Sequence, residues 1–182
     1  MSNKMRIALL ALAVLTVAVA AGGQGSRPAS AYSGGSYANI TNGTVSMGVW
    51  DTGQLNVPGG PSHVPPYTDA SYLVNFTGLH YNPTGNESTS PGCLCEGWGA
   101  ADAITGITGH ANEDYGDPVN MTVLSFISDA DSATSLVDIG GIMQVKHDYQ
   151  PSGVTPFLYR VTVSVENTSG NLIHLRYRRV MD

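Results

Sequence analysis

After residue 32 the chain consists of short runs of β-branched and aromatic residues, separated by Gly, Pro, Asn or Asp. No stretch there has the apolar spacing of an amphipathic helix three turns long. This pattern is typical of β-strands joined by turns. It predicts roughly nine short strands from runs at residues 38–40, 44–50, 54–57, 71–76, 79–81, 121–128, 134–139, 142–149, 157–166 and 172–180, of which 71–76 and 79–81 are strand pieces.

Turn residues suggest how some of these strands connect. Asn42-Gly43 separates the first two runs, and both residue types tolerate the positive φ of a tight hairpin. Residues 159–166 alternate between apolar and polar side chains, and we predict that the strand at 157–166 pairs with residues 172–180 through a turn at 167–171. Without a repeat of fixed period, the pattern predicts an all-β, antiparallel β-sandwich.

The N-terminus has the three parts of a secretory signal peptide. Lys4 and Arg6 precede an uncharged run over residues 7–21, and Ala29-Ser30-Ala31 supplies a small-x-small cleavage site. The run is shorter than the ~20 residues that cross a bilayer, so we favour cleavage over the alternative of an uncleaved anchor. We therefore predict a signal peptide at 1–31 and a secreted or cell-surface domain at 32–182, without a membrane span in the mature chain.

Cleavage changes the charge of the exported part. The whole chain has a net charge of −6, and residues 32–182 keep 5 basic residues against 14 acidic ones, a net charge of about −9. A surface this acidic repels phosphate backbones, which disfavours nucleic acid as a partner.

The two cysteines, Cys93 and Cys95, are one residue apart. In an oxidising compartment they indicate a disulfide or another structural pair. Bonding between chains and a redox or metal role are the alternatives. A closed thiolate metal site requires about four ligands, and no second cysteine pair exists.

Few other residues indicate chemistry. The histidines are isolated, and no nucleophile elbow, P-loop or dinucleotide-binding fingerprint is present. Two acidic loops contain oxygen ligands of the kind calcium prefers, at Asp114, Asp117, Asp129 and Asp131. Solvated turns on an acidic protein are the interpretation we favour, which leaves calcium as the cofactor to test.

Aromatic residues offer a second ligand hypothesis. Trp50 and Trp98 could stack on sugar rings, whereas packing in the core is the interpretation we favour. Stacking requires an exposed indole on a concave surface, and core packing requires both indoles to be buried.

Three segments, residues 40–60, residues 91–99 with the sequence PGCLCEGWG, and residues 175–182, resemble one group of bacterial extracellular proteins. Some members carry a C-terminal PEP-CTERM sorting segment that an exosortase processes. The resemblance implies an extracellular location and a strand architecture, and the group supplies no established catalytic residues. In that group the chain continues past the strand that ends here at Asp182, so we expect the natural protein to continue, and attachment to the surface stays open.

We therefore expect a non-catalytic β-sandwich of the cell surface or extracellular matrix. The alternative is a carbohydrate-binding or carbohydrate-active module. The expected partner is a surface or matrix polysaccharide or a protein.

Overall fold

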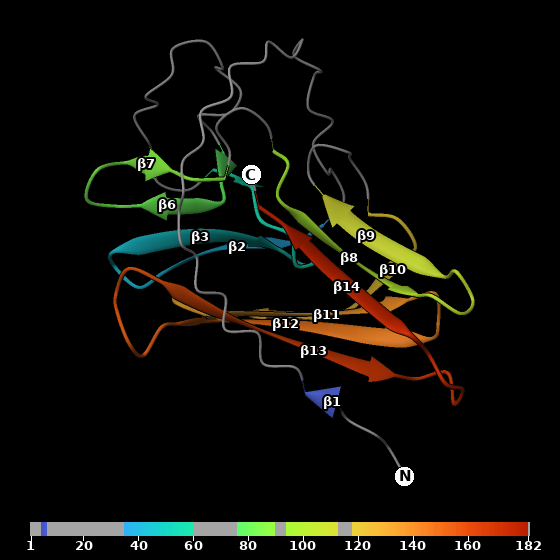
Figure 1. Ribbon diagram of the computed structural model, residues 1–182. Helices are drawn as coiled ribbons and strands as arrows, with labels where there is room; N and C mark the ends of the chain where they lie inside the picture. The colour runs from blue at the N-terminus through green and yellow to red at the C-terminus, as the bar shows by residue number, and fades with distance from the viewer. Residues whose placement is uncertain (1–4, 7–34, 60–75, 90–93, 113–117, 182) are drawn as a thin grey trace.

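The computed structural model describes residues 5–6, 35–59, 76–89, 94–112 and 118–181. These residues form strands in antiparallel sheets and contain no helix, so the predicted all-β class is confirmed. Figure 1 shows two layers, one formed by β10 to β13 and the other by β2, β3, β6 and β7 together with β8, β9 and β14. Within the described residues no helix is long and apolar enough to cross a membrane.

The first layer has the strand order β1-β13-β12-β11-β10. Its strands are β1 (Met5–Arg6), β10 (Met121–Ser128), β11 (Ala133–Ile139), β12 (Met143–Pro151) and β13 (Tyr159–Asn167). The alternating sequence places one side of each of the three central strands against the core. The four strands predicted for residues 121–166 are confirmed, with ends displaced by at most two residues.

The second layer consists of two main sheets. One has the order β2-β3-β6-β7, formed by β2 (Tyr37–Thr41), β3 (Val45–Trp50), β6 (Leu79–Tyr81) and β7 (Asn86–Glu87). The other has the order β14-β8-β9, formed by β14 (Leu175–Val180), β8 (Gly97–Asp102) and β9 (Thr108–Asn112). A short ladder joins β4 (Val57–Pro58) to β5 (Phe76–Thr77).

The predicted hairpin at Asn42-Gly43 is present between β2 and β3. Gly43 has a φ of 90°, a conformation that side chains disfavour. The side-chain oxygen of Asn42 accepts hydrogen bonds from the backbone N–H groups of Thr44 and Val45. The sequence therefore identifies this turn correctly because its requirements are local.

Two predictions about strands were wrong, and two strands were missed. β13 pairs with β12 and β1, whereas β14 pairs with β8 in the other layer, so residues 157–166 and 172–180 do not form a hairpin. β8 and β9 were not predicted, because they are rich in Gly and Ala and contain few β-branched residues. Of the strand predicted at 54–57, only Val57 belongs to a strand, since residues 54–56 lie in a buried connection.

Apolar side chains fill the space between the layers in two clusters. One surrounds Trp98, Ile139, Met143 and Val145, and the other surrounds Tyr149 with residues of β2 and β3. Buried polar side chains also lie in this interior, among them Glu96, Ser135 and His147. Because a buried polar group is costly without partners, these residues require an account of what they bind.

Candidate functional site

The connection at residues 51–56 follows β3 and runs through the interior. Side chains from both layers bind its backbone. Ser135 Oγ donates to Asp51 O, Trp98 Nε1 to Thr52 O at 2.9 Å, and Tyr149 OH to Gly53 O. These bonds provide partners for buried carbonyl groups outside any strand ladder.

Gly53 of this connection packs closely against His147 of β12. Its φ is +85°, and a Cβ added there would lie 2.8 Å from Nδ1 of His147. Both the backbone conformation and the available space therefore require glycine at this position.

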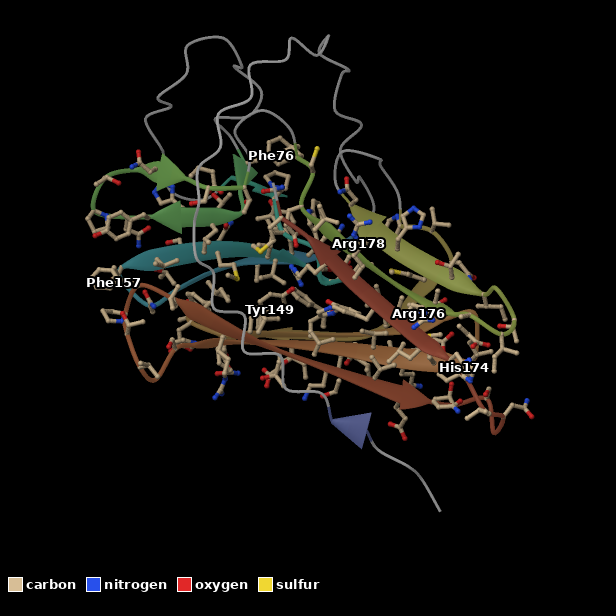
Figure 2. All side chains as sticks on the ribbon, in the orientation of Figure 1. Phe76, Tyr149, Phe157, His174, Arg176 and Arg178 are labelled. Atoms are coloured by element: carbon tan, nitrogen blue, oxygen red, sulfur yellow. The ribbon has the colours of Figure 1, made fainter. Side chains whose placement is uncertain are left out.

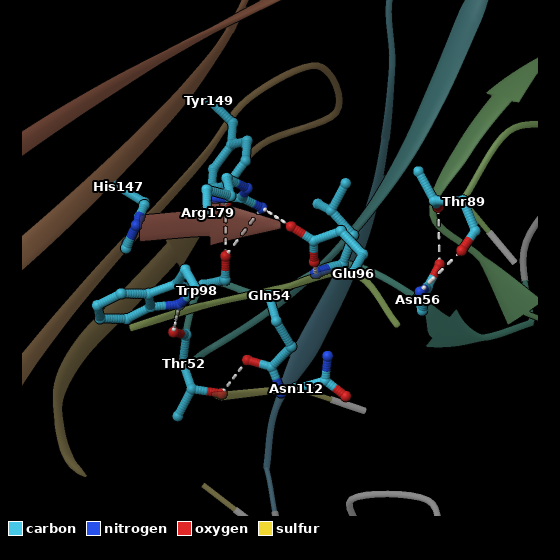
Figure 3. A network of polar contacts seen from close by, with 12 residues as sticks. Thr52, Gln54, Asn56, Thr89, Glu96, Trp98, Asn112, His147, Tyr149 and Arg179 are labelled. Atoms are coloured by element: carbon cyan, nitrogen blue, oxygen red, sulfur yellow. Dashed lines mark hydrogen bonds and ion pairs between the residues drawn. The ribbon is translucent and has the colours of Figure 1, made fainter. Parts of the chain in front are cut away.

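Glu96 and Arg179 form an ion pair in the interior, with 2.6 Å between Oε1 and Nη2 (Figure 3). The Glu96 side chain has no exposed surface, and 16% of that of Arg179 is exposed. Burial raises the pKa of Glu96, an effect that the charge of Arg179 opposes. The other oxygen of Glu96 accepts a hydrogen bond from the backbone N–H of Leu55. The Arg179 guanidinium also donates to Gly53 O at 3.3 Å, so the pair holds the buried connection at two points.

Aromatic side chains surround the guanidinium and the neighbouring imidazole. Arg179 donates to Tyr149 OH at 2.9 Å, and its guanidinium carbon lies 5.6 Å from the centre of that ring. His147 Nε2 is 2.9 Å from Tyr177 OH, and its ring centre is 4.3 Å from that of Trp98. Burial, and then the charge of Arg179, lower the pKa of His147 well below its usual value. His147 is therefore neutral at pH 7.

A second polar cluster lies beside β6 and β7. Thr89 donates to Asn56 Oδ1 at 2.8 Å, and Glu87 accepts hydrogen bonds from the backbone of Leu79 at 2.8 Å and of Thr89 at 3.0 Å. Figure 3 shows Asn56 and Thr89 apart from the Glu96 network, toward the green strands. These contacts fix short strands and loops to one another, as the first network does for residues 51–56.

The outer face of the β14-β8-β9 sheet contains a trough along β8. Trp98 and Ala100 of β8 point into the core, so Gly97, Gly99 and Ala101 point outward. These small residues form the floor of the trough.

Larger side chains of the adjacent strands form the walls. Strand register places Val180 and Asn112 beside Gly97, Arg178 and His110 beside Gly99, and Arg176 and Thr108 beside Ala101. The cavity between the walls has a volume of about 600 Å³. The geometry thus offers an open, elongated site on the surface and a closed polar network inside.

Comparison of the chain with family models, with curated proteins and with solved structures found no match.

The two tryptophans do not offer a stacking surface. Trp50 is 2% exposed and Trp98 is 3% exposed, and the indole of Trp98 packs in the core between the layers. Their N–H groups donate to Asn56 O and Thr52 O in the buried connection. The hypothesis that Trp50 and Trp98 stack on a ligand requires exposed rings, and their burial contradicts it.

Cys95 is disulfide-bonded in the structure. The sequence contains one other cysteine, Cys93, which lies outside the described residues. The pairing of Cys93 with Cys95 therefore stays a prediction, and alkylation of the thiols with and without reductant tests it.

The four calcium candidates are not brought together by the described residues. Asp129 and Asp131 are exposed in the turn between β10 and β11, and Asp114 and Asp117 lie outside the described residues. In the part of the chain that the structure describes, no group of three His, Cys, Asp or Glu side chains could hold a metal ion. Calcium binding stays a prediction, which a higher melting temperature in calcium than in a chelator would support.

Sequence reasoning missed the residues of the interior network. Arg179 follows Leu175 and Tyr177 at two-residue spacing, and His147 follows Met143 and Val145 in the same way. Both polar residues therefore stand at positions that alternation assigns to the core side of a strand. Glu96 gave no such indication, because it precedes a strand that was not predicted.

Proposed function

We propose that this protein is an exported, non-catalytic β-sandwich that serves as a component of the cell surface or extracellular matrix. The observation that supports the proposal best is that three buried ionisable groups bind other parts of the protein. Glu96, His147 and Arg179 all lie between the layers and contact the protein itself. Catalytic acids and bases instead require access to a substrate, which this arrangement does not provide.

Export is proposed from the N-terminal sequence. A positive n-region, a short apolar run and a small-x-small site are what a signal peptidase requires. Expression of the full chain in a secreting bacterial host should yield an extracytoplasmic protein whose N-terminus is Tyr32. Retention of the intact N-terminus in the membrane fraction would contradict this part of the proposal.

Carbohydrate recognition is the second candidate function, and the trough on the β14-β8-β9 sheet is the observation that favours it. Its β9 wall contains exposed Thr108 and His110, which are side chains of the kinds that can hydrogen-bond sugar hydroxyl groups. Recognition there would depend on polar side chains, since both tryptophans are buried.

The proposal that the protein is not an enzyme is tested by a hydrolase screen. The purified protein should show no turnover of glycoside, ester or peptide substrates above a host blank. Turnover that is lost in a folded Glu96→Gln or His147→Gln variant would overturn the proposal. Turnover that these variants retain would overturn it as well and would place the active site elsewhere.

A further inference from the structure

The trough is floored by small residues on a strand that is paired on both sides. Glycine within a strand weakens it and commonly marks a close approach of a ligand or of another backbone. At Gly97 the neighbouring strand supplies a packing reason, because an added Cβ would lie 2.6 Å from Ala111 O. At Gly99 the nearest neighbours of an added Cβ are 3.2 Å away, so a small shift would admit alanine. Packing within the sheet thus accounts for Gly97 more fully than for Gly99.

One wall of the trough is positively charged. Arg176 and Arg178 alternate with the inward side chains of β14 and are exposed, whereas Arg179 turns into the core. They are two of the 5 basic residues within 32–182, a region whose net charge is about −9. Figure 2 shows both arginines along β14, apart from Tyr149 between the layers. Among the described residues no acidic side chain lines the trough. The charge of this face therefore favours an anionic ligand.

The spacing of the arginines favours an elongated ligand with repeated charge. Alternate residues of a strand lie about 6.8 Å apart on the same face. Each guanidinium presents a planar fork of donors that matches a carboxylate. A ligand running along β8 would thus meet the two guanidinium groups in succession, while Thr108 and His110 face its other side.

A peptide fits this face less well than a glycan. Extended peptides bind sheets mainly by adding to an unpaired strand edge, and β8 has β14 on one side and β9 on the other. The opposite wall offers the exposed His110 imidazole and the oxygen of the exposed Thr108 hydroxyl, which suit the hydroxyl groups of a sugar. The Thr108 hydroxyl donates to Ala100 O at 3.3 Å, and the Asn112 amide donates to Cys95 O at 2.7 Å.

We propose that the trough binds a segment of an acidic polysaccharide, with uronate carboxylates on Arg176 and Arg178 and hydroxyl groups on the β9 wall. This inference deepens the carbohydrate-binding candidate and rests on the proposed function for the location of the protein outside the cell.

The test is calorimetric titration of the protein, expressed from the full sequence, with oligogalacturonate. Arg178→Gln should weaken binding about tenfold, because it removes a charge-assisted hydrogen-bonding group. Arg176→Gln should act similarly, and added salt should weaken binding further. Arg160→Gln is the matched control, since it removes an exposed arginine from β13 in the other layer.

A steric variant tests the location independently of charge. Ala101→Leu places a larger side chain on the floor and should abolish binding while leaving both arginines in place. If this variant fails to fold, the Arg176→Gln and Arg178→Gln results decide alone, because both side chains are exposed.

Several results would overturn the proposal. They are no binding of oligogalacturonate at millimolar concentration, equal binding of neutral dextran, equal binding of polyglutamate, and an equal loss of affinity in Arg160→Gln. Equal binding of polyglutamate would assign the trough to acidic peptides instead. None of these results bears on export or on the absence of turnover, so the proposed function can stand when this inference fails.

Discussion

Glu96 and Arg179 meet at 2.6 Å between the two layers, and both also bind the connection at residues 51–56. Glu96 accepts a hydrogen bond from Leu55 N, and Arg179 donates one to Gly53 O. The ion pair therefore links the start of β8 to the end of β14 and fixes both to a buried segment that belongs to neither strand. This relationship makes the stability of the interior depend on charge as well as on apolar packing.

Removing one member of the pair should be strongly destabilising. Arg179→Met leaves the Glu96 carboxylate buried without its counter-charge, and we expect a loss of about 3–5 kcal/mol in the free energy of unfolding. The double variant Glu96→Met/Arg179→Met should lose less than the sum of the two single variants. Urea unfolding measures these values, with Arg178→Met, exposed on the same strand, as a control near zero. Additive losses would show that the two side chains act independently.

Gly53→Ala should destabilise the fold more than the same change at Gly43. Both glycines have positive φ, at +85° and +90°, so alanine at either position costs about 1–2 kcal/mol of backbone strain. A Cβ at Gly43 has no neighbour within 4 Å, whereas one at Gly53 would lie 2.8 Å from His147 Nδ1. Thermal unfolding of the two variants separates the backbone effect from the contact, and equal shifts in Tm would contradict the close approach.

His147 should make the protein less stable as the pH falls below 6.5. Burial holds the folded-state pKa of His147 well below 6.5, so the unfolded chain binds a proton at a higher pH than the folded protein does. Proton binding then stabilises the unfolded state relative to the folded one. Through this one group the free energy of unfolding falls by up to about 1.4 kcal/mol for each unit by which the pH is lowered. Groups that face the imidazole are Tyr177, Tyr149 and Arg179. Comparison of wild type with His147→Gln between pH 7 and pH 5.5 isolates the effect, and parallel curves would refute it.

Asp102 should contribute to stability in a lower pH window. Burial opposes its charge, yet hydrogen bonds from Ile104, Thr105 and His174 hold the pKa of Asp102 at about 2. Because this value lies below the ordinary 3.8, the contribution is complete above pH 3.8 and is lost as the pH falls to about 2.

Asp102→Asn provides the corresponding measurement. The Asp102→Asn variant should have a lower free energy of unfolding than wild type at pH 5, and this difference should disappear near pH 2. Urea unfolding at both pH values checks this, and a difference that does not change with pH would show that the charge is irrelevant.

Alternation and turn chemistry in the sequence determined much of the fold. Residues 121–166 alternate because one side of each strand faces the core, and the structure confirms strands there. The Asn42-Gly43 hairpin is confirmed for the same reason, since its requirement for positive φ is local.

Sheet partners were decided only by the tertiary structure. Alternation in β13 and β14 shows which side of each strand is apolar, and it holds no information on which strand lies alongside. The strands are consecutive and were predicted to pair, yet β14 crosses to the other layer and pairs with β8. β8 escaped prediction because its outward residues are Gly and Ala, the feature that creates the trough.

The sequence by itself thus determined the all-β class, the long strands of residues 121–166 with their core-facing sides, and the first hairpin, because each follows from residues within one short segment. The tertiary structure decided what the buried polar residues do, since Glu96, His147 and Arg179 stand far apart in the chain. It also decided the trough, because three strands must lie in one register before Gly99 comes to stand between Arg178 and His110.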